Sequence, residues 1–460
     1  MAIKLESAAE PQIAIVGGGI VGVILALGLV RQNISVHVYE QAAGFREIGA
    51  GIAFSACARH AKVDLMDPVI TEALGRCGAV LISDEDKEDD YLRWIDGYNQ
   101  YHTDDSTYQK PLAQIGGAGF KGCRRDQFLE ELAKDMPPDV IEFSKRLEGL
   151  EKREDGKITL TFSDGTSADV DAVIGCDGVK SCVRKFMFGA DHEASIAQYT
   201  HKTAYRGLVP LDLATKVLGE WKANNFHHHV GPGAHITHYP VANHKVLNVV
   251  VFLSDPEPWF DSSSMIAEGT RDQVEAALSG WHPTVLGLVK LLPEKLVTWG
   301  LFDLGDFPLP HYNDGRVCLA GDAAHASSPH HGAGACLGIE DALCLNVLLG
   351  QVQQAPFESK GTALVAAFKT FDSMRRLRTQ WLVNSSRRVC DLYHQSEWAD
   401  PKRRTKAETC FEEIRDRSYK IWHFDADNMV EHAVAEYKQR FSALGHGSLQ
   451  FEDNEDSYHL

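Results

Sequence analysis

Residues 13–40 read IAIVGGGIVGVILALGLVRQNISVHVYE. The apolar run at 13–16 has the composition of a strand that is buried on both faces. Three glycines follow it, residues 23–30 suit a helix, and residues 35–40 form a second β-type run. The order strand, glycine turn, helix, strand predicts a βαβ unit, and this unit indicates an α/β fold with a Rossmann-like domain.

The glycines of this turn have the spacing GxGxxG, and each has its own physical task. Gly17 permits the tight turn, Gly19 lets the backbone approach a pyrophosphate, and Gly22 allows close packing of helix on strand. Glu40 ends the second strand, where a carboxylate accepts hydrogen bonds from ribose hydroxyls and repels a 2′-phosphate. We therefore predict a dinucleotide site here, in preference to a purely structural turn.

Residues 117–122, GAGFKG, repeat this spacing in a different context. The preceding segment, KPLAQI at 110–115, does not have the pattern of a buried strand. No second strand ending in an acid lies about 20 residues further on. We predict a loop here, so the chain has one Rossmann fingerprint and no second one for a nicotinamide nucleotide.

The 460-residue chain carries 46 Lys and Arg against 64 Asp and Glu, a net charge of −18. This charge argues against nucleic acid or an anionic membrane as a partner. The apolar run at 13–30 is long enough for a membrane helix, but its glycines favour strand, turn and helix. The ten cysteines are scattered and the N-terminus does not resemble a signal peptide, so the expected compartment is the cytoplasm. The run His227-His228-His229 is not expected to hold a metal, since neighbouring strand residues point to opposite faces.

Two more motifs stand at the ends of buried-type runs. Asp177-Gly178 follows the run at 171–175, and Gly321-Asp322 follows the run at 316–320. The second continues through a glycine-rich loop, and a helix is expected to begin near Gly334. A carboxylate at Asp322 can hold ribityl hydroxyls, and N–H groups at a helix start stabilise negative charge on a reduced flavin or on phosphate. In this order, the three motifs indicate FAD.

The rest of the chain suggests three regions. A discontinuous FAD-binding domain is predicted from residues 1–80, 105–185 and 305–350. An inserted antiparallel-sheet domain for the substrate, inferred from period-two strands, is predicted from residues 81–104 and 186–304. Residues 351–460 are predicted to form a C-terminal helical region.

These motifs resemble the class A flavoprotein monooxygenases of the p-hydroxybenzoate hydroxylase and salicylate hydroxylase type, over nearly the whole chain. Within that family the sequence resembles above all the fungal polyketide-pathway enzymes that dearomatise phenols, those of tropolone, azaphilone and sorbicillin pathways. The segments that carry the resemblance are residues 45–54, 123–129, 205–208, 321–335 and 422–425.

The resemblance implies roles for individual residues. Glu40 would bind the adenosine ribose, while Gly51 and Ala53 would line the FAD site. Arg125 would reach the cofactor from the other side. The remaining contacts, with the ribityl–flavin region, would come from Asp322, Gly334 and Ala335.

The resemblance also places the chemistry at two strand residues. Arg206 would stabilise and position a phenolate, and Tyr239 would hydrogen-bond it and select the ring carbon that faces the flavin. Without the resemblance, a surface ion pair and a core tyrosine are the simpler interpretation. His330 and His331, in the loop before Gly334, either line the pocket or cap the loop.

The implied activity is oxidative dearomatisation of a phenolic polyketide such as an alkylated resorcylaldehyde, with FAD as cofactor, NAD(P)H and O₂ as co-substrates, and a flavin C4a-hydroperoxide as the oxygenating species. A simple phenol or salicylate hydroxylase is the first alternative. A non-catalytic FAD-fold binding protein of the Rab escort type is the second. The oligomeric state is left open.

Overall fold

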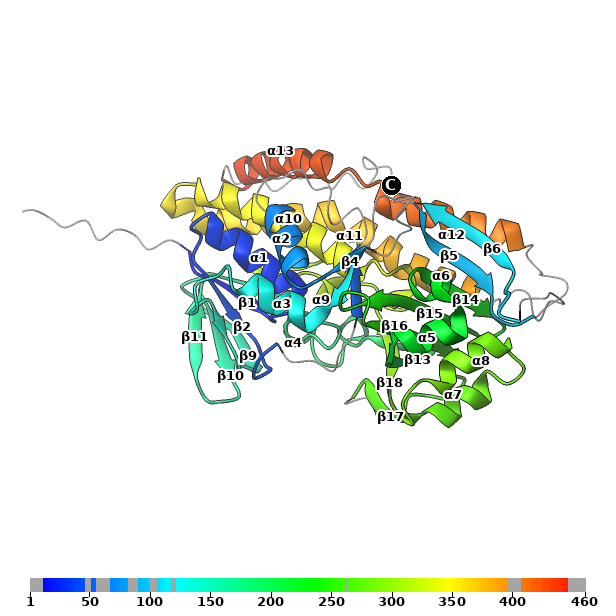
Figure 1. Cartoon of the computed structure of the whole chain (residues 1–460). Helices are drawn as coiled ribbons and strands as arrows, with labels where there is room; N and C mark the ends of the chain where they lie inside the picture. Colours follow the sequence, from blue (N-terminus) through cyan, green and yellow to red (C-terminus); the bar gives the residue numbers. More distant parts are fainter. Residues whose placement is uncertain are drawn as a thin grey trace, which may run out of the picture.

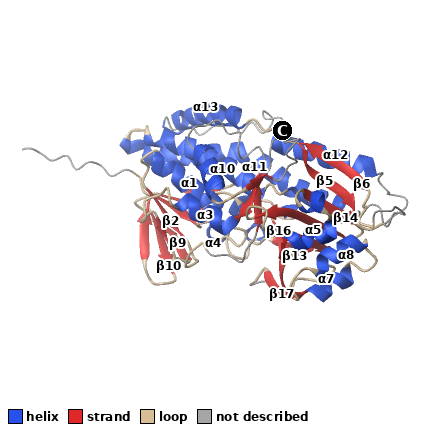
Figure 2. Ribbon diagram, in the orientation of Figure 1, coloured by secondary structure: helices blue, strands red, loops and turns tan. Residues whose placement is uncertain are grey.

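The computed structural model describes residues 11–45, 51–54, 67–81, 90–99, 106–116, 121–261, 264–394 and 407–445. Two large sheets lie side by side, and the C-terminal helices extend along one side of both (Figure 1). Figure 2 shows helices lying over the sheet that contains the N-terminal strands, and both strands and helices in the other half. This is the mixed α/β architecture predicted from the sequence.

The first sheet has six strands and contains the predicted βαβ unit. Strand β1 pairs in parallel with β2 and β12, β12 with β20, and β2 with β8, while β19 is an antiparallel edge. Their bounds, in sheet order, are β19 Asn313–Asp314, β20 Val317–Leu319, β12 Ala172–Gly175, β1 Ile13–Val16, β2 Val36–Tyr39 and β8 Ile141–Glu142. Helix α1 (Ile20–Arg31) connects β1 to β2. The apolar run at 13–30 is therefore a buried strand, a turn and a buried helix, as predicted.

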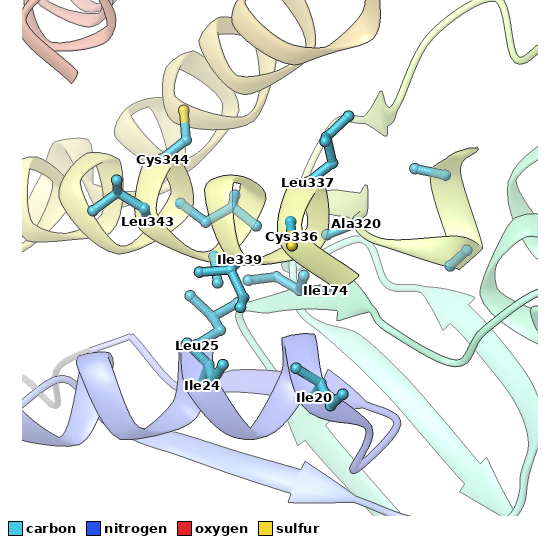
Figure 3. Packing of buried hydrophobic residues seen from close by; sticks show 14 of the residues in the cluster. Ile20, Ile24, Leu25, Ile174, Ala320, Cys336, Leu337, Ile339, Leu343 and Cys344 are labelled. Atoms are coloured by element: carbon cyan, nitrogen blue, oxygen red, sulfur yellow. The ribbon is translucent and has the colours of Figure 1, made fainter. Parts of the chain in front are cut away.

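Helix α1 is apolar on nearly all sides because it lies between the sheet and a second buried helix, α10 (Gly334–Gln353). Figure 3 shows Ile24 and Leu25 of α1 close to Ile339 of α10, with Ile174 of β12 beneath. By length and composition alone α10 could cross a membrane, but 83% of its most apolar window is buried inside the chain. It is the central helix of the core.

The second sheet has eight strands and is antiparallel except where β14 pairs with β5. In order, its strands are β17 Ile266–Thr270, β18 Lys295–Asp303, β13 Gln198–Pro210, β16 Val246–Ser254, β15 Ala234–Val241, β14 Phe226–Gly231, β5 Asp90–Asp96 and β6 Pro111–Gly116. One face packs against helices α5 (Leu211–Leu218), α7 (Arg271–Ala277) and α8 (Pro283–Lys290). The opposite face joins the core of the first sheet.

Strand β6 differs from what its sequence suggests. Residues 110–115 do not have a buried-strand pattern, yet 111–116 form a strand at the edge of the large sheet, paired with β5. Only Ile115 of this strand is buried, so periodicity gives little signal. The predicted FAD-domain segment beginning at 105 therefore contributes a strand to the other sheet. Gly122 lies within β7 (Lys121–Arg124), a strand, so it does not open a helix as a Rossmann turn requires.

Smaller elements complete the molecule. A three-stranded sheet of β3 (Gly51–Phe54), β7 and β4 (Val80–Leu81) lies beside helices α2 (Asp67–Arg76) and α3 (Arg125–Ala133). Strands β9 (Leu147–Lys152), β10 (Ile158–Phe162) and β11 (Ser167–Val170) form an antiparallel ribbon. The predicted helical region contains α11 (Lys360–Tyr393), α12 (Ala407–Trp422) and α13 (Ala426–Gly445).

Candidate active site

The three sequence motifs meet at one edge of the first sheet. Because β1, β2, β12 and β20 are parallel, their carboxyl ends lie together. The N–H of Gly17 donates to the Tyr39 carbonyl at 2.8 Å, and that of Cys176 donates to the Val16 carbonyl at 2.7 Å. The N–H of Ala320 donates to the Gly175 carbonyl at 2.9 Å. This is the edge at which open parallel sheets bind ligands.

Two glycines of the first motif are required by the protein itself. Gly17 has φ +109°, and a Cβ there would lie 2.6 Å from the carbonyl carbon of Cys176. A Cβ on Gly22 would overlap the Gly17 carbonyl oxygen. These contacts hold α1 against β1 and bring the first motif against the second.

Gly19 is different. Among the residues that the structure describes, a Cβ there would have ordinary contact with one side chain, Arg125, at 3.7 Å from Nη2. Its φ of −74° suits any residue. The free space at this helix start fits the close backbone approach that a pyrophosphate needs. This vacant volume is the structural feature that fits the predicted dinucleotide.

Two charged side chains, those of Glu40 and Arg125, lie next to this turn. Glu40 follows β2 and accepts from the N–H of Gly18 at 2.7 Å and of Ala42 at 2.7 Å. Arg125 opens α3, and its guanidinium faces Gly19. Strand β3, with Gly51 and Ala53, pairs with β7 directly before α3 and so lies on the same side. A carboxylate and a guanidinium thus flank the glycine turn, and they could hold a ribose and a pyrophosphate.

Asp177 has a structural role. Its carboxylate accepts from the Ser181 hydroxyl at 2.5 Å and from the N–H groups of Cys182 and Val183 at 2.6 and 3.1 Å. It therefore caps helix α4 (Cys182–Phe188), and burial raises its pKa above the usual range. Arg184 of this helix donates to the Ala323 carbonyl at 2.8 Å, so the second motif is tied to the third. Burial lowers the pKa of Arg184 to about 10.

The third motif forms the turn between β20 and the short helix α9 (Asp322–His325). Gly321 adopts φ +59°, and the Asp322 side chain is exposed at this edge. One Asp322 oxygen would lie 4.0 Å from a Cβ on Gly334, the first residue of α10. Ala335 follows, half-buried in the same turn. Asp322, Gly334 and Ala335 are therefore brought together beside an α10 N-terminus whose N-cap residue, Ala333, supplies no side-chain cap.

A buried charge cluster lies under this turn, and sequence reasoning missed it. Asp341 of α10 is fully buried and accepts from the Gly321 N–H at 2.9 Å, from His325 Nε2 at 2.6 Å and from Arg375 Nε at 2.8 Å. Burial alone would raise the pKa of Asp341, but His325 and Arg375 hold it at about 2. The signal was present in the sequence, because Glu340-Asp341 interrupts an otherwise apolar helix.

The cluster extends to the C-terminal helices. Glu340 binds Arg375 at 2.8 Å and accepts from Nε and Nη2 of Arg378, each at 2.9 Å. The Phe424 ring lies over the Arg378 guanidinium at 3.6 Å. Phe424 belongs to the segment 422–425 that carries part of the family resemblance, and its cation–π contact with Arg378 is a physical reason for an aromatic residue at this position. The packing of α11 and α12 therefore bears on the position of the third motif.

Arg206 and Tyr239 lie on the large sheet, away from the glycine turn. Arg206 is on β13 and Tyr239 on β15, and β16 runs between them. Tyr239 is 7% exposed and belongs to the core shared with the first sheet. The Arg206 guanidinium lies 5.4 Å from the Trp299 ring centre. By the alternation of strand residues, both side chains lie on the face of the large sheet opposite helices α5, α7 and α8.

The two loop histidines have different surroundings. His330, in the turn Pro329–His331, is 4% exposed and packs edge-on against His235 and Phe252 of the large sheet. His331 Nε2 lies 2.9 Å from the Ser385 hydroxyl of α11. A cavity of about 290 Å³ reaches His330. The first histidine therefore lines the wall between the two halves, and the second anchors the loop.

Comparison with known proteins gives the family. The model of an FAD binding domain matches residues 123–386. A salicylate hydroxylase from Sarocladium schorii is 68% identical over 449 residues, 95% of this chain and 93% of that protein. The chain belongs to the FAD-dependent monooxygenases. A second such monooxygenase, from Phoma sp, is 67% identical over 443 residues, 94% of this chain and 99% of that protein.

A solved structure of a salicylate hydroxylase has the same fold as this monooxygenase. A salicylate hydroxylase in a substrate complex has a TM-score of 0.76 at 26% identity and covers 93% of this chain and 98% of its own. FAD is thus the cofactor, and the Gly17–Gly22 turn belongs to a flavin enzyme. The non-catalytic binding protein is set aside, because the relatives just described are named as monooxygenases and hydroxylases.

Gly19 and Gly22 should respond differently to alanine. Gly22→Ala places a methyl group on the Gly17 carbonyl oxygen, so it should lower the melting temperature and abolish FAD binding. Gly19→Ala should leave the melting temperature of the apoprotein within about 1–2 °C but deplete the purified protein of FAD, because its methyl group fills the space proposed for the pyrophosphate. Flavin absorbance and thermal unfolding measure both. A Gly19→Ala protein that retains full FAD would contradict this placement.

Asp341→Asn should destabilise the protein by about 3–5 kcal/mol, since it leaves Arg375 and His325 buried beside a neutral partner. Chemical denaturation measures this. Because the pKa of Asp341 is lowered on folding, its stabilisation is present above the ordinary carboxyl range and is lost as the pH falls towards about 2.

The matched control is Asp169→Asn, which breaks an exposed ion pair with Arg153 and should cost far less stability than Asp341→Asn. Equal stabilities of the two variants would show that the buried cluster does not contribute as described.

Proposed function

We propose that this monooxygenase hydroxylates and dearomatises a phenolic polyketide, of the alkylated resorcylaldehyde type, in fungal secondary metabolism. The observation that carries the proposal is the placement of Arg206 and Tyr239 on one face of the large sheet. They are separated by one intervening strand, a spacing of about 10 Å, which leaves room for a single aromatic ring between the side chains.

Arg206 supplies the charge that this chemistry needs. A guanidinium beside a bound phenol favours the phenolate and so lowers the pKa of that phenol. The negative charge makes the ring electron-rich at the carbons ortho and para to the oxygen. Arg206 therefore both anchors the substrate and activates it.

Tyr239 serves as a donor. Burial raises the pKa of its hydroxyl above the usual range, although the Arg206 charge acts in the opposite direction. The hydroxyl thus stays protonated at neutral pH and donates a hydrogen bond to a substrate oxygen. Because one phenolate is held from two strands, its ring has a fixed orientation with respect to the FAD-binding half.

Bound FAD supplies the activated oxygen atom after its reduction by NAD(P)H. For each turnover, one phenol, one O₂, one NAD(P)H and one proton give one hydroxylated product, one NAD(P)⁺ and one water. The protein orients the phenolate, stabilises its charge and excludes water. If the attacked carbon carries an alkyl group, no proton can leave from it, and the product remains a non-aromatic dienone alcohol.

Simple hydroxylation of a salicylate-like phenol is the second candidate. The name of the 68% identical relative, a salicylate hydroxylase, favours it. The two reactions use the same phenolate and the same cofactor. They differ in which ring carbon faces the flavin, so the products distinguish them.

Incubation with 3-methyl-resorcylaldehyde and, separately, with salicylate tests the proposal. We expect 3-methyl-resorcylaldehyde to give a non-aromatic product that is heavier by one oxygen atom, identified by mass spectrometry and NMR. A catechol from either compound, with no dienone, would establish the second candidate instead.

Arg206→Ala should keep the FAD absorption spectrum and lose on the order of 100-fold or more in kcat/KM, the effect of removing one group that stabilises a reacting oxyanion. Arg206→Lys keeps the charge but not the planar fork, so its activity should lie in between. Steady-state kinetics with the substrate identified above measure both. Wild-type kcat/KM in the alanine variant would exclude the phenolate role.

A further inference from the structure

Asn248 lies between the two proposed substrate residues. In the register of the sheet, Asn248 of β16 is directly opposite Tyr239 of β15. Arg206 of β13 is opposite Val250, so it is a diagonal neighbour of Asn248, with a Cα–Cα distance of about 7–8 Å. The three polar residues therefore stand on three adjacent strands.

The side chain of Asn248 faces the FAD-binding half. Its neighbours along the strand, Leu247 and Val249, belong to the core on the opposite face, under helices α5 and α8. Tyr239 and the flanking Leu208, the two residues directly opposite Asn248, pack against the core of the first sheet. The alternation of strand residues thus directs Asn248 towards the substrate side.

The amide of Asn248 has an unused donor. The residue is only 3% exposed, and its Nδ2 has no hydrogen-bond partner in the part of the chain that the structure describes. A buried amide donor without a partner costs about 1–3 kcal/mol. An unsatisfied group at this position is explained if a bound molecule supplies the acceptor.

We infer that Asn248 is a specificity residue, whose Nδ2 donates a hydrogen bond to a second, carbonyl-type oxygen of the phenolic substrate. This rests on the function proposed above. Arg206, Asn248 and Tyr239 form a wall that offers donors from three strands. These donors select a ring that carries a carbonyl acceptor next to its phenolate. An alkyl substituent at that place offers no acceptor, so a buried donor would stay without a hydrogen bond. Asn248 does not take part in oxygen transfer.

The test compares two ligands that differ only in the carbonyl group, 3-methyl-resorcylaldehyde and 2-methylresorcinol. The dissociation constant of each is measured from the change in flavin absorption when it binds to the oxidised holoenzyme. Asn248→Leu, which removes the donor and keeps the branched outline of the side chain, should weaken binding of the aldehyde about tenfold and change that of 2-methylresorcinol less than twofold. Asn248→Asp should weaken aldehyde binding at least as much, because it replaces the donor with an acceptor.

Stability separates this role from a structural one. The unpartnered donor predicts that Asn248→Leu unfolds at the wild-type temperature or above it, whereas a structural asparagine would lower that temperature. Thr298→Val is the matched control, since Thr298 is a buried polar residue of the same sheet that is paired with Tyr205, next to Arg206, and so points to the other face. It should leave both dissociation constants unchanged.

Equal weakening of both ligands, or of neither, in Asn248→Leu would overturn the inference. Because the readout is binding, it does not depend on the product. A catechol from the wild-type enzyme would refute dearomatisation and leave the Asn248 comparison intact, whereas a wild-type enzyme that binds neither ligand would refute both.

Discussion

The contact on which the rest of the molecule depends is the one between the glycine turn and the strands on either side of it. The Gly17 backbone approaches Cys176 so closely that no side chain fits between them, and Gly22 packs on Gly17 in the same way. These contacts fix α1 against β1 and bring the end of β12 beside it. The cofactor edge of the sheet exists because these positions carry no Cβ, while the space at Gly19 remains for a ligand.

A second constraint acts on the same edge from below. The Asp341–His325–Arg375 cluster holds the Gly321 turn from inside the core, where each charge loses its hydration. Such clusters add little to stability compared with apolar packing, since desolvation offsets most of the attraction. They do impose a geometry, because a carboxylate with three donors has one arrangement that satisfies all of them. If Asp322 binds the cofactor as proposed, its turn benefits more from this defined geometry than from additional apolar burial.

The residues proposed for the chemistry lie in a different part of the fold. The large sheet turns one face to helices α5, α7 and α8 and the other to the FAD-binding half, so alternate residues of each strand belong to different environments. Arg206, Asn248 and Tyr239 share the second face. Because the proposed substrate residues are separate from the cofactor edge, they can change with the substrate while the cofactor site stays the same.

The sequence by itself determined the cofactor edge, because its information is local. One short segment contains the glycine spacing, the strand before it and Glu40. The pairing of parallel strands is then enough to place their carboxyl ends at one edge of the sheet. It also indicated the antiparallel half through period-two strands. Arg206 and Tyr239 were proposed by resemblance, since one arginine and one tyrosine on strands carry no signal of their own. Strand β6, the Asp341 cluster and the position of Asn248 were decided only by the tertiary structure. The physical reason is that each depends on a partner far away in the chain: the β5 edge, the arginines of α11, and the register that places β13, β16 and β15 side by side.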